Sequence, residues 1–501
     1  MTAPSATDPL PDDPPALRVR VRELADALAD ARREIDALRA RLDHLLHRLY
    51  GPKSERAANT PEPSDTPVSP PPPAAGAGQA DRPPRRGHGR RRLPRELPRR
   101  RVEHDLTDAE KACPCCRAPR VRIGEEVSER LDYRPASLFV VEHVRPKYAC
   151  TSCRGRVAIP PMPAEPLPKG MAAPGLLAQI VTAKFADHLP LFRQARILGR
   201  HGIDLHRSTL GDWLRECAAV LRPIYDAMCG AVRRSKVIHT DDTPVPVLDR
   251  DRDRTRTARI WVYVGDPAHP YTVYDATPSR SRDGPQAFLQ DFTGFVQADA
   301  FGGYDGLYDT GATEVACWAH ARRKFVDARP TDPARCDHAL AAVRRLYAVE
   351  RRGRERTSDE RLSLRQRESV PVLRELGEWL EATRRDVLPK SPLAQAITYA
   401  LNQWAALNVY VTDGDLAIDN NAAERALRGV AVGRKNWLFW GSDGGGRTAA
   451  VLTSLTATCG RHGIDPWCYL SDVLARLPSH PVDRIAELLP DVWAAARRAA
   501  S

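Results

Sequence analysis

The sequence lacks any long hydrophobic run: none reaches the roughly 18 residues that favour a membrane span. Its first residues, Met1–Pro15, are rich in proline and aspartate and lack the basic-then-apolar order of a signal peptide. These absences lead us to expect a protein of the reducing cytoplasm that makes no membrane contact.

Acidic residues are too few to balance the basic ones: 64 aspartates and glutamates face 76 lysines and arginines, for a formal net charge of +12. Such an excess favours a polyanionic partner, with nucleic acid as the first candidate. The alternative, on charge alone, is a soluble protein whose surface is merely basic.

Apolar residues recur at alternating steps of four and three from Leu17 to Leu49. This spacing is the a/d seam of a coiled coil, whereas a helix packed on a core would show a wider stripe. We therefore predict a coiled coil over residues 16–50 that makes the protein a homo-oligomer. Packing of this helix within its own chain is the alternative.

A linker follows at residues 51–101. It contains four consecutive prolines, Pro70 to Pro73, and its end from Arg82 to Arg101 carries ten arginines against one glutamate. A segment of this composition cannot bury a core, so we predict that it is disordered when free. It either clamps phosphates without regard to base sequence or serves as a soluble spacer.

Four of the eleven cysteines form two C-x2-C pairs separated by 33 residues. They are Cys113, Cys116, Cys150 and Cys153. This spacing delivers four thiolates to a tetrahedral Zn²⁺, and four thiolates leave no open position for catalysis. We predict a structural zinc domain at residues 102–160. Cys115 is adjacent and offers an alternative ligand, and a disulfide fits poorly with a cytosolic chain.

Three helices are predicted between residues 174 and 222, and Ser208 is a suitable N-cap for the third. A helix, a turn and a capped helix that carries Arg207 and Arg215 resemble a helix-turn-helix. We therefore expect residues 172–230 to bind DNA through these arginines, although a helical hairpin without that role would show the same pattern.

Two adjacent carboxylates, Asp241 and Asp242, end the apolar run that begins at Val237, and Pro244 is expected to stop this strand. Successive side chains on a strand face opposite ways, so only one of the two acids can point into a given site. Asp299 follows a later strand, 294–298, where glycines free the backbone.

The remaining strands are expected at 259–264, 271–274 and 314–318, with a helix before the strand at 294–298 and a basic helix at 319–328. Three strands, a helix, a strand, a strand and a helix is the order of a ribonuclease-H-like α/β fold. We predict such a core at residues 235–450, with strand-end carboxylates that hold a divalent metal, interrupted by a helical insertion at about 330–415.

Glu424 begins a further helix and fits a capping box with Asn421, which is the purely structural interpretation of this residue. Arg434 and Lys435 precede a run of aromatic residues, a combination suited to phosphates and base stacking. The alternative for that stretch is a hydrophobic strand with a solvated basic start. A C-terminal helical region is expected over 451–501.

Taken together, these motifs resemble the transposases of IS66-type insertion sequences. The stretches that carry the resemblance are HTDDTPVPVL, QADAFGGYDGLY, CWAHARRKF, DNNAAERALRGVAVGRKNWLFWGS and the closing ELLP. The likeness runs from the heptads, through LYGPKSER and the cysteine pairs, to the C-terminus. It implies an acidic-triad (DDE) transposase on a ribonuclease-H-like core.

The resemblance assigns Asp241, Asp299 and Glu424 to the triad. The family has a DET-like motif at the first position and this chain has a second aspartate there, so Asp242 is kept as an alternative first ligand. Cys317 and His320 match a C-x-x-H motif of the family, which we interpret as structural support because two ligands are too few for zinc.

Three carboxylates of this kind hold two Mg²⁺ or Mn²⁺ ions roughly 3.5–4 Å apart, one activating water or a 3′-hydroxyl and the other stabilising the leaving oxygen. The resemblance implies that the protein binds double-stranded DNA, both the terminal inverted repeats and the target, and catalyses strand cleavage and strand transfer. It also suggests accessory transposition proteins and a place on the bacterial nucleoid.

Three other interpretations compete with this one. A DNA-binding regulator with a zinc domain and a helix-turn-helix would leave about half of the chain without an assigned function. A ribonuclease-H-like nuclease without strand transfer would share the triad but would not need the coiled coil, zinc domain and basic linker together. A decayed transposase copy is the third, although all three acids and all four cysteines are present.

Overall fold

The structure is a computed structural model that describes residues 164–500, apart from 168–169 and 250–252, together with a few positions between 13 and 141. The predicted linker and most of the predicted coiled coil and zinc domain, including its four cysteines, therefore lie outside the described residues. Residues 21–26 of the predicted coiled coil are described; they are helical, and Val21 and Leu24 are exposed. By its contacts the chain divides into two units, and residues 164–500 belong to the first.

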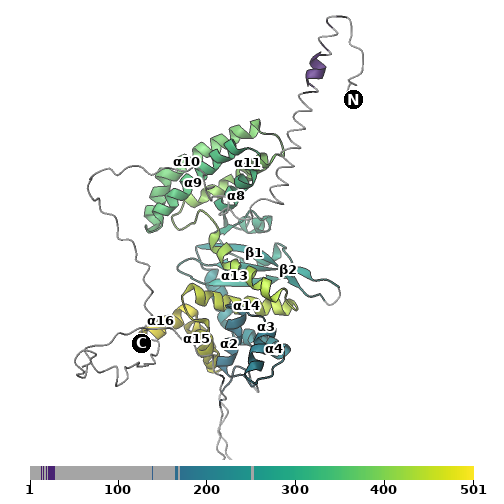
Figure 1. Cartoon of the computed structure of the whole chain (residues 1–501). Coiled ribbons are helices and arrows are strands. Elements are labelled where there is room, and N and C mark those ends of the chain that lie inside the picture. Colours follow the sequence, from purple (N-terminus) through teal and green to yellow (C-terminus); the bar gives the residue numbers. More distant parts are fainter. Residues whose placement is uncertain are drawn as a thin grey trace, which may run out of the picture. The chain divides into compact units, whose positions relative to one another are not determined.

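A five-stranded sheet forms the centre of this part of the chain (Figure 1). Its strands are β1 (Val237–Val247), β2 (Arg256–Val264), β3 (Thr272–Thr277), β4 (Phe295–Ala298) and β5 (Thr313–Ala316). Their order across the sheet is β3-β2-β1-β4-β5. β1, β2 and β3 pair antiparallel, whereas β1, β4 and β5 pair parallel. The chain thus lays down a three-stranded meander and then adds two parallel strands beside its first strand.

Strand β1 continues through both of its prolines, so the expectation that Pro244 ends it is wrong. The backbones of Pro244 and Pro246 face away from β2: the Pro246 carbonyl accepts a hydrogen bond from the Trp440 N–H at 2.9 Å. Proline is tolerated in a strand where its missing N–H would not have served the ladder. The strand therefore reaches Val247, where Trp440 pairs with it in a single bridge.

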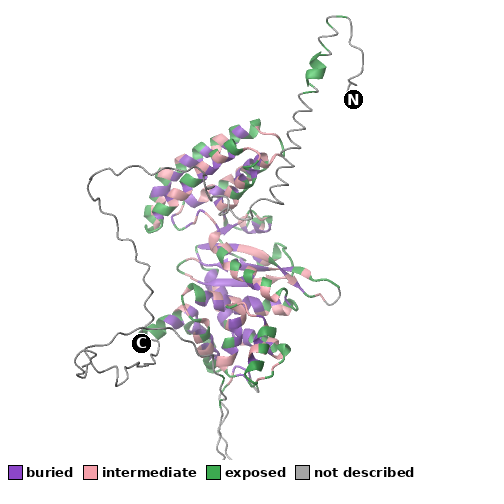
Figure 2. Cartoon of the chain, in the orientation of Figure 1, coloured by how far each residue is buried: buried purple, intermediate pink, exposed green. Residues whose placement is uncertain are grey.

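Helices cover one face of the sheet with segments from both ends of the chain. They are α2 (Pro174–Phe185), α3 (Leu191–Arg200), α4 (Arg207–Val220), α5 (Arg222–Val232), α14 (Asp443–Arg461), α15 (Pro466–Arg476), the 3₁₀ turns η4 (Leu477–Ser479) and η5 (Val482–Leu488), and α16 (Pro490–Ala500). Their apolar residues share one core with Ile238, Trp261, Tyr263 and Val296 of the strands. Figure 2 shows these strands and the inner sides of the helices as buried.

The third helix predicted between residues 174 and 222 begins two residues earlier than expected, and the N-cap assigned to Ser208 is wrong. The N-cap is His206, whose Nδ1 accepts a hydrogen bond from the Ser208 N–H at 3.3 Å. The His206 imidazole therefore performs the capping that we expected of the Ser208 hydroxyl. Ser208 lies in the first turn and donates its N–H to that imidazole. Arg207 is consequently the first residue of α4.

The opposite face of the sheet is covered by α13 (Asn421–Trp437), whose Ala423, Leu427 and Val430 pack on Val245 and Val262. This helix continues to Trp437, and Leu438 then adopts a left-handed backbone with φ 66°. The alternative of a hydrophobic strand after Gly433 is therefore not found. Arg434 and Lys435 lie in the last turn of the helix.

Helix α8 (Trp318–Ala328) follows β5, and the helical insertion comes after it; both lie against the edge of the sheet that β5 forms. The elements of the insertion are α9 (Pro333–Gly353), α10 (Ser358–Asp386), α11 (Pro392–Asn402), α12 (Trp404–Asn408) and η3 (Val409–Val411). Helix α8 packs with them. They share a second core with Val237 and Val315. Shorter elements, α6 (Asp283–Phe288), η2 (Gly302–Tyr304) and α7 (Asp305–Tyr308), connect the strands.

Arg365 on α10 fixes the segment that leaves the insertion. Its guanidinium is almost fully buried, pairs with Glu350 at 2.6 Å, and donates to the carbonyls of Tyr410, Asp413 and Leu416. A buried charge of this kind is stable only when it is paired and fully hydrogen-bonded. The segment that precedes α13 is thereby held to the insertion on one side.

The same segment is held to the sheet on its other side. Gln297 of β4 donates its side-chain amide to the Ala417 carbonyl and accepts from the Ala417 N–H at 3.3 Å. The start of α13 is therefore placed by both the insertion and the sheet.

Among helices in the part of the chain that the structure describes, none is both long and apolar enough to cross a membrane.

Candidate active site

Two neighbouring aspartates of β1 lie on opposite faces of the sheet. Asp241 pairs across the strands with Val262, which packs under α13, whereas Asp242 pairs with Trp261, which belongs to the core on the other face. Cross-strand partners share a face and adjacent residues do not. The register therefore directs Asp241 toward the start of α13.

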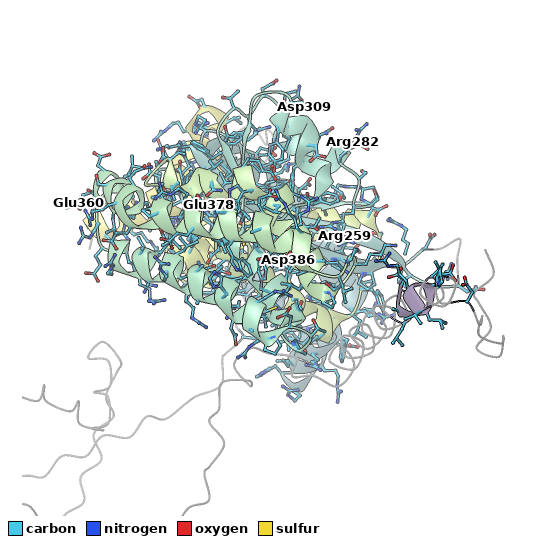
Figure 3. The ribbon with its side chains drawn as sticks, turned by 90° about the horizontal axis from the view of Figure 1, so that it is seen from above. Arg259, Arg282, Asp309, Glu360, Glu378 and Asp386 are labelled. Carbon is cyan, nitrogen blue, oxygen red and sulfur yellow. The ribbon has the colours of Figure 1, made fainter. Side chains whose placement is uncertain are left out.

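Asp242 is held by two guanidinium groups. Arg259 of β2, labelled in Figure 3, donates to it at 2.8 Å, and Arg280 donates at 2.9 Å. The Asp242 side chain is only 2% exposed. Its charge is thus already neutralised within the protein, and a metal ion would have to displace two arginines to reach it.

Asp241 has a different environment. Its carboxylate accepts the Asp242 N–H at 2.7 Å, and no basic side chain among the described residues is ion-paired with it. Of the two candidates for the first acid, the geometry favours Asp241 because its charge is still available to a cation.

Asp299 directly follows β4, the strand that pairs with β1. β1 and β4 pair in parallel as far as His239 and Gln297, and two more residues along each strand reach Asp241 and Asp299. Residues at matching positions of neighbouring parallel strands lie side by side, so Asp299, just past the end of β4, lies beside Asp241 in the middle of β1. Arg280 also approaches Asp299, with its Nη2 3.5 Å from the carboxylate.

Glu424 comes from the first turn of α13, and the capping box, the purely structural alternative for this residue, is not formed. The helix begins at Asn421, its N-cap is Asn420, and no side chain caps it. The Glu424 carboxylate instead lies 3.7 Å from His320 Nε2. Its orientation is therefore not explained by helix capping.

Asn420 fastens the start of α13 to the strand beside Asp241. This buried side chain donates to the Thr240 carbonyl at 2.8 Å, and its oxygen lies 3.2 Å from His239 Nδ1. Its backbone N–H reaches Cys317 Sγ at 3.2 Å. Sequence reasoning missed this residue as a positioning group; the only signal was its place in the DNN motif.

The carboxylates act on one another electrostatically. Burial raises the pKa of the Asp241 carboxyl to about 7. The negative charges of Asp299, Asp242 and Glu424 act in the same direction, whereas the hydrogen bond from the Asp242 N–H acts in the opposite one. Burial also lowers the pKa of His239 to about 4, so this imidazole is neutral at pH 7 and does not offset the acids.

The donor set fits a hard divalent cation. Asp241, Asp299 and Glu424 offer only oxygen, which Mg²⁺ and Mn²⁺ prefer. Burial, and to a smaller extent the neighbouring carboxylates, raise the pKa of Asp241, and a bound cation would favour its ionised form.

A family model described as the IS66 family of transposases matches residues 169–448, which include the sheet, the insertion and all three acids. This match spans more than half of the chain. The chain belongs to the IS66 transposase family.

Three further models of this family match other parts of the transposase. A zinc-finger binding domain of IS66 transposases matches residues 110–154, which contain Cys113, Cys116, Cys150 and Cys153 and indicate Zn²⁺. An IS66 C-terminal element matches residues 454–490. A model described as transposase C of IS166 homeodomain matches residues 37–102.

Relatives of the transposase include two proteins of Sinorhizobium fredii. The uncharacterized protein y4jD is 36% identical over 96% of this chain and 99% of its own length. The uncharacterized protein y4hP is 36% identical over 81% of this chain and 77% of its own length.

The four basic residues expected to contact DNA are not gathered at the acids. Arg215 lies on α4 and pairs with Asp212 at 2.9 Å, and Arg207 opens the same helix. Arg434 donates to the Pro244 carbonyl and so ties α13 to β1. Lys435 is exposed. The structure thus brings Asp241, Asp299 and Glu424 together and leaves the basic residues on separate elements.

Proposed function

We propose that this IS66 family member is a DDE transposase that binds the terminal inverted repeats of its insertion sequence and catalyses metal-dependent cleavage and strand transfer of DNA. Asp241, Asp299 and Glu424 are its catalytic acids. The observation that carries the proposal is the convergence of these carboxylates from β1, the end of β4 and α13, with no basic partner at Asp241 in the described chain.

The catalytic core in this proposal is ribonuclease-H-like, with the insertion between β5 and α13. The strand order β3-β2-β1-β4-β5, with a three-stranded antiparallel meander and a parallel pair, supports it. In this topology the end of β4 lies beside the middle of β1, next to Asp241, and Glu424 belongs to a helix that returns to the sheet.

Mg²⁺ or Mn²⁺ held by the three carboxylates supplies activation of the attacking oxygen and charge stabilisation at the leaving oxygen. The protein itself must hold these acids in place. Asn420 holds α13 against β1, and Arg280 holds Asp299 from the other side while its guanidinium stacks 4.0 Å from the Phe301 ring centroid. Arg207, Arg215, Arg434 and Lys435 contact the DNA backbone in this proposal.

The zinc domain recognises the transposon end in this account. Cys113, Cys116, Cys150 and Cys153 bind one structural Zn²⁺, whose binding energy folds a module too small to have a large core of its own. Cys150→Ser should remove this zinc and weaken end binding, whereas Cys229→Ser, a buried cysteine of α5, should do neither. Metal analysis and a band-shift assay measure both.

The coiled coil at residues 16–50 joins copies of the transposase on double-stranded DNA of the bacterial nucleoid, with accessory transposition proteins as further partners. Deletion of residues 1–50 should lower the oligomeric state in sedimentation experiments. An unchanged oligomer would assign assembly to another surface.

Strand transfer of a labelled donor end tests the proposed function. The intact chain should cleave and join DNA with Mg²⁺ and not with EDTA. Asp241→Asn, Asp299→Asn and Glu424→Gln should each abolish both steps and leave end binding intact, while Asp309→Asn, at an exposed aspartate directly after α7 that is labelled in Figure 3, should behave as the parent. Cleavage without joining would favour a nuclease, and activity that survives all three substitutions would overturn the proposal.

A further inference from the structure

A second cluster of potential metal ligands adjoins the carboxylates. Cys317 is the buried N-cap residue of α8, and His320 lies one turn further along the same helix. Together with Glu424 of α13 they present one sulfur, one nitrogen and one oxygen, all within 4.8 Å of one another. The C-x-x-H motif alone offers two ligands; the fold supplies the third from a residue 104 positions after His320.

The geometry of this cluster is that of ligands rather than of hydrogen-bond partners. His320 Nε2 and the Glu424 carboxylate are 3.7 Å apart, which is too long for a hydrogen bond. Two donors at about 2.0–2.2 Å from one tetrahedral zinc would lie roughly 3.4 Å apart. The separation therefore leaves space for an ion and requires only a small contraction around it.

The imidazole of His320 has unused bonding capacity. Its Nδ1 is buried and has no hydrogen-bond partner, and Nε2 makes no hydrogen bond to any residue that the structure describes. No existing hydrogen bond of the ring would have to be broken for metal to bind.

The chemistry of the donors selects the metal. A thiolate and an imidazole are soft or borderline ligands that favour Zn²⁺ and similar transition metals over Mg²⁺. Three protein ligands leave a fourth position open, unlike the closed set of four thiolates predicted for the zinc domain.

We propose that Cys317, His320 and Glu424 form a second binding site, next to the proposed triad, for a single Zn²⁺ or similar transition-metal ion. Burial raises the pKa of the Cys317 thiol to about 11, so the sulfur is protonated without metal. Binding therefore forms the metal–sulfur bond and releases the thiol proton to solvent.

This site shares Glu424 with the proposed catalytic triad, which makes it inhibitory. A Zn²⁺ ion on Cys317 and His320 draws the Glu424 carboxylate away from Asp241 and Asp299. Zn²⁺ should then suppress Mg²⁺-dependent cleavage, and Cys317→Ser should relieve the suppression. This consequence rests on the proposed function, whereas the binding of the ion does not.

Metal counting on the intact chain tests the binding itself. After equilibrium dialysis against Zn²⁺, the parent protein should retain one more zinc per chain than Cys317→Ser or His320→Ala. Cys336→Ser is the matched control, because Cys336 is also a fully buried free cysteine on the insertion and does not belong to the cluster. It should keep the parent count.

Cobalt gives an independent readout. With the zinc domain already loaded with Zn²⁺, added Co²⁺ should produce a thiolate-to-cobalt charge-transfer absorption in the parent and in Cys336→Ser, and none in Cys317→Ser. His320 is partly exposed, so His320→Ala keeps the test decisive if Cys317→Ser fails to fold. Equal zinc counts in the parent and in folded His320→Ala would contradict the proposed zinc site. This result would not depend on whether the triad cleaves DNA.

Discussion

The side chains of Asp241 and Asp242, adjacent on strand β1, lie on opposite faces of the sheet in opposite electrostatic environments. Asp242 is buried between Arg259 and Arg280, which balance its charge. Asp241 has no ion-paired basic side chain among the described residues, and burial together with the negative charges of Asp299 and Glu424 raises its pKa. One residue of displacement along a strand therefore separates a structural ion pair from a candidate metal ligand. The difference teaches that adjacency in sequence says little about role when the pleat assigns the faces.

The largest effect should come from Asp241→Asn. The substitution keeps the shape of the side chain and removes the charge that faces the other acids, so cleavage should fall by more than the roughly 100-fold that loss of a supporting partner costs. Gel assays of donor-end cleavage with Mg²⁺ measure the rate. A loss of tenfold or less would place the first acid elsewhere.

Asn420→Ala should have the next largest effect. It removes the hydrogen bonds to Thr240 and His239 that hold α13 beside β1, and positioning groups of this kind are worth about 10–100-fold in activity. The KM for donor DNA should change little while kcat falls. Parallel losses of end binding and folding would instead mark Asn420 as a residue of general stability.

The pH dependence of Mg²⁺ affinity should follow the ionisation of Asp241. The folded protein holds the Asp241 proton up to about pH 7, whereas an unfolded chain releases it near 3.8. For the metal-free protein, the stability from this group is present below about pH 4 and is lost as the pH rises through about 7. Mg²⁺ must displace the same proton, so its affinity should weaken about tenfold per unit below pH 7.

Calorimetric titration of Mg²⁺ between pH 6 and 8 measures this slope. The same substitution that removes the carboxyl, Asp241→Asn, should remove the metal-free pH dependence of the melting temperature in this range. A slope that persists in Asp241→Asn would assign the titration to another group.

Asp242→Asn should have the smallest effect on chemistry and a clear effect on stability. It leaves Arg259 and Arg280 without their shared partner, and charged hydrogen bonds of this type contribute about 1.5–3 kcal/mol. The free energy of unfolding in urea should fall by about that amount, while Mg²⁺-dependent cleavage remains within about tenfold of the parent. Arg259→Gln offers a comparison that removes only one of the two pairs.

The sequence predicted the five strands and their succession along the chain because its apolar runs are short and bounded by glycines, prolines and acids. It placed the start of the second strand late, at 259 rather than Arg256, and ended the first at Pro244. The reason is that proline signals a break only where the N–H is needed, and the neighbour that satisfies the Pro246 carbonyl, Trp440, is almost 200 residues away.

The choice between Asp241 and Asp242 could not be made from the sequence for a similar reason. Arg259 and Arg280, which neutralise Asp242, lie 17 and 38 residues along the chain. Asn420 and His320 were missed as neighbours of the acids because their contacts bridge more than 100 residues. Local patterns identify the acids, whereas the fold decides which groups surround them.

The most direct test of this account is metal binding by the two aspartate variants side by side. Mn²⁺ binding to the intact chain, followed by electron paramagnetic resonance, should be lost in Asp241→Asn and retained in Asp242→Asn at pH 8. Retention in Asp241→Asn with loss in Asp242→Asn would contradict the assignment of the first acid and the interpretation of the two faces of β1.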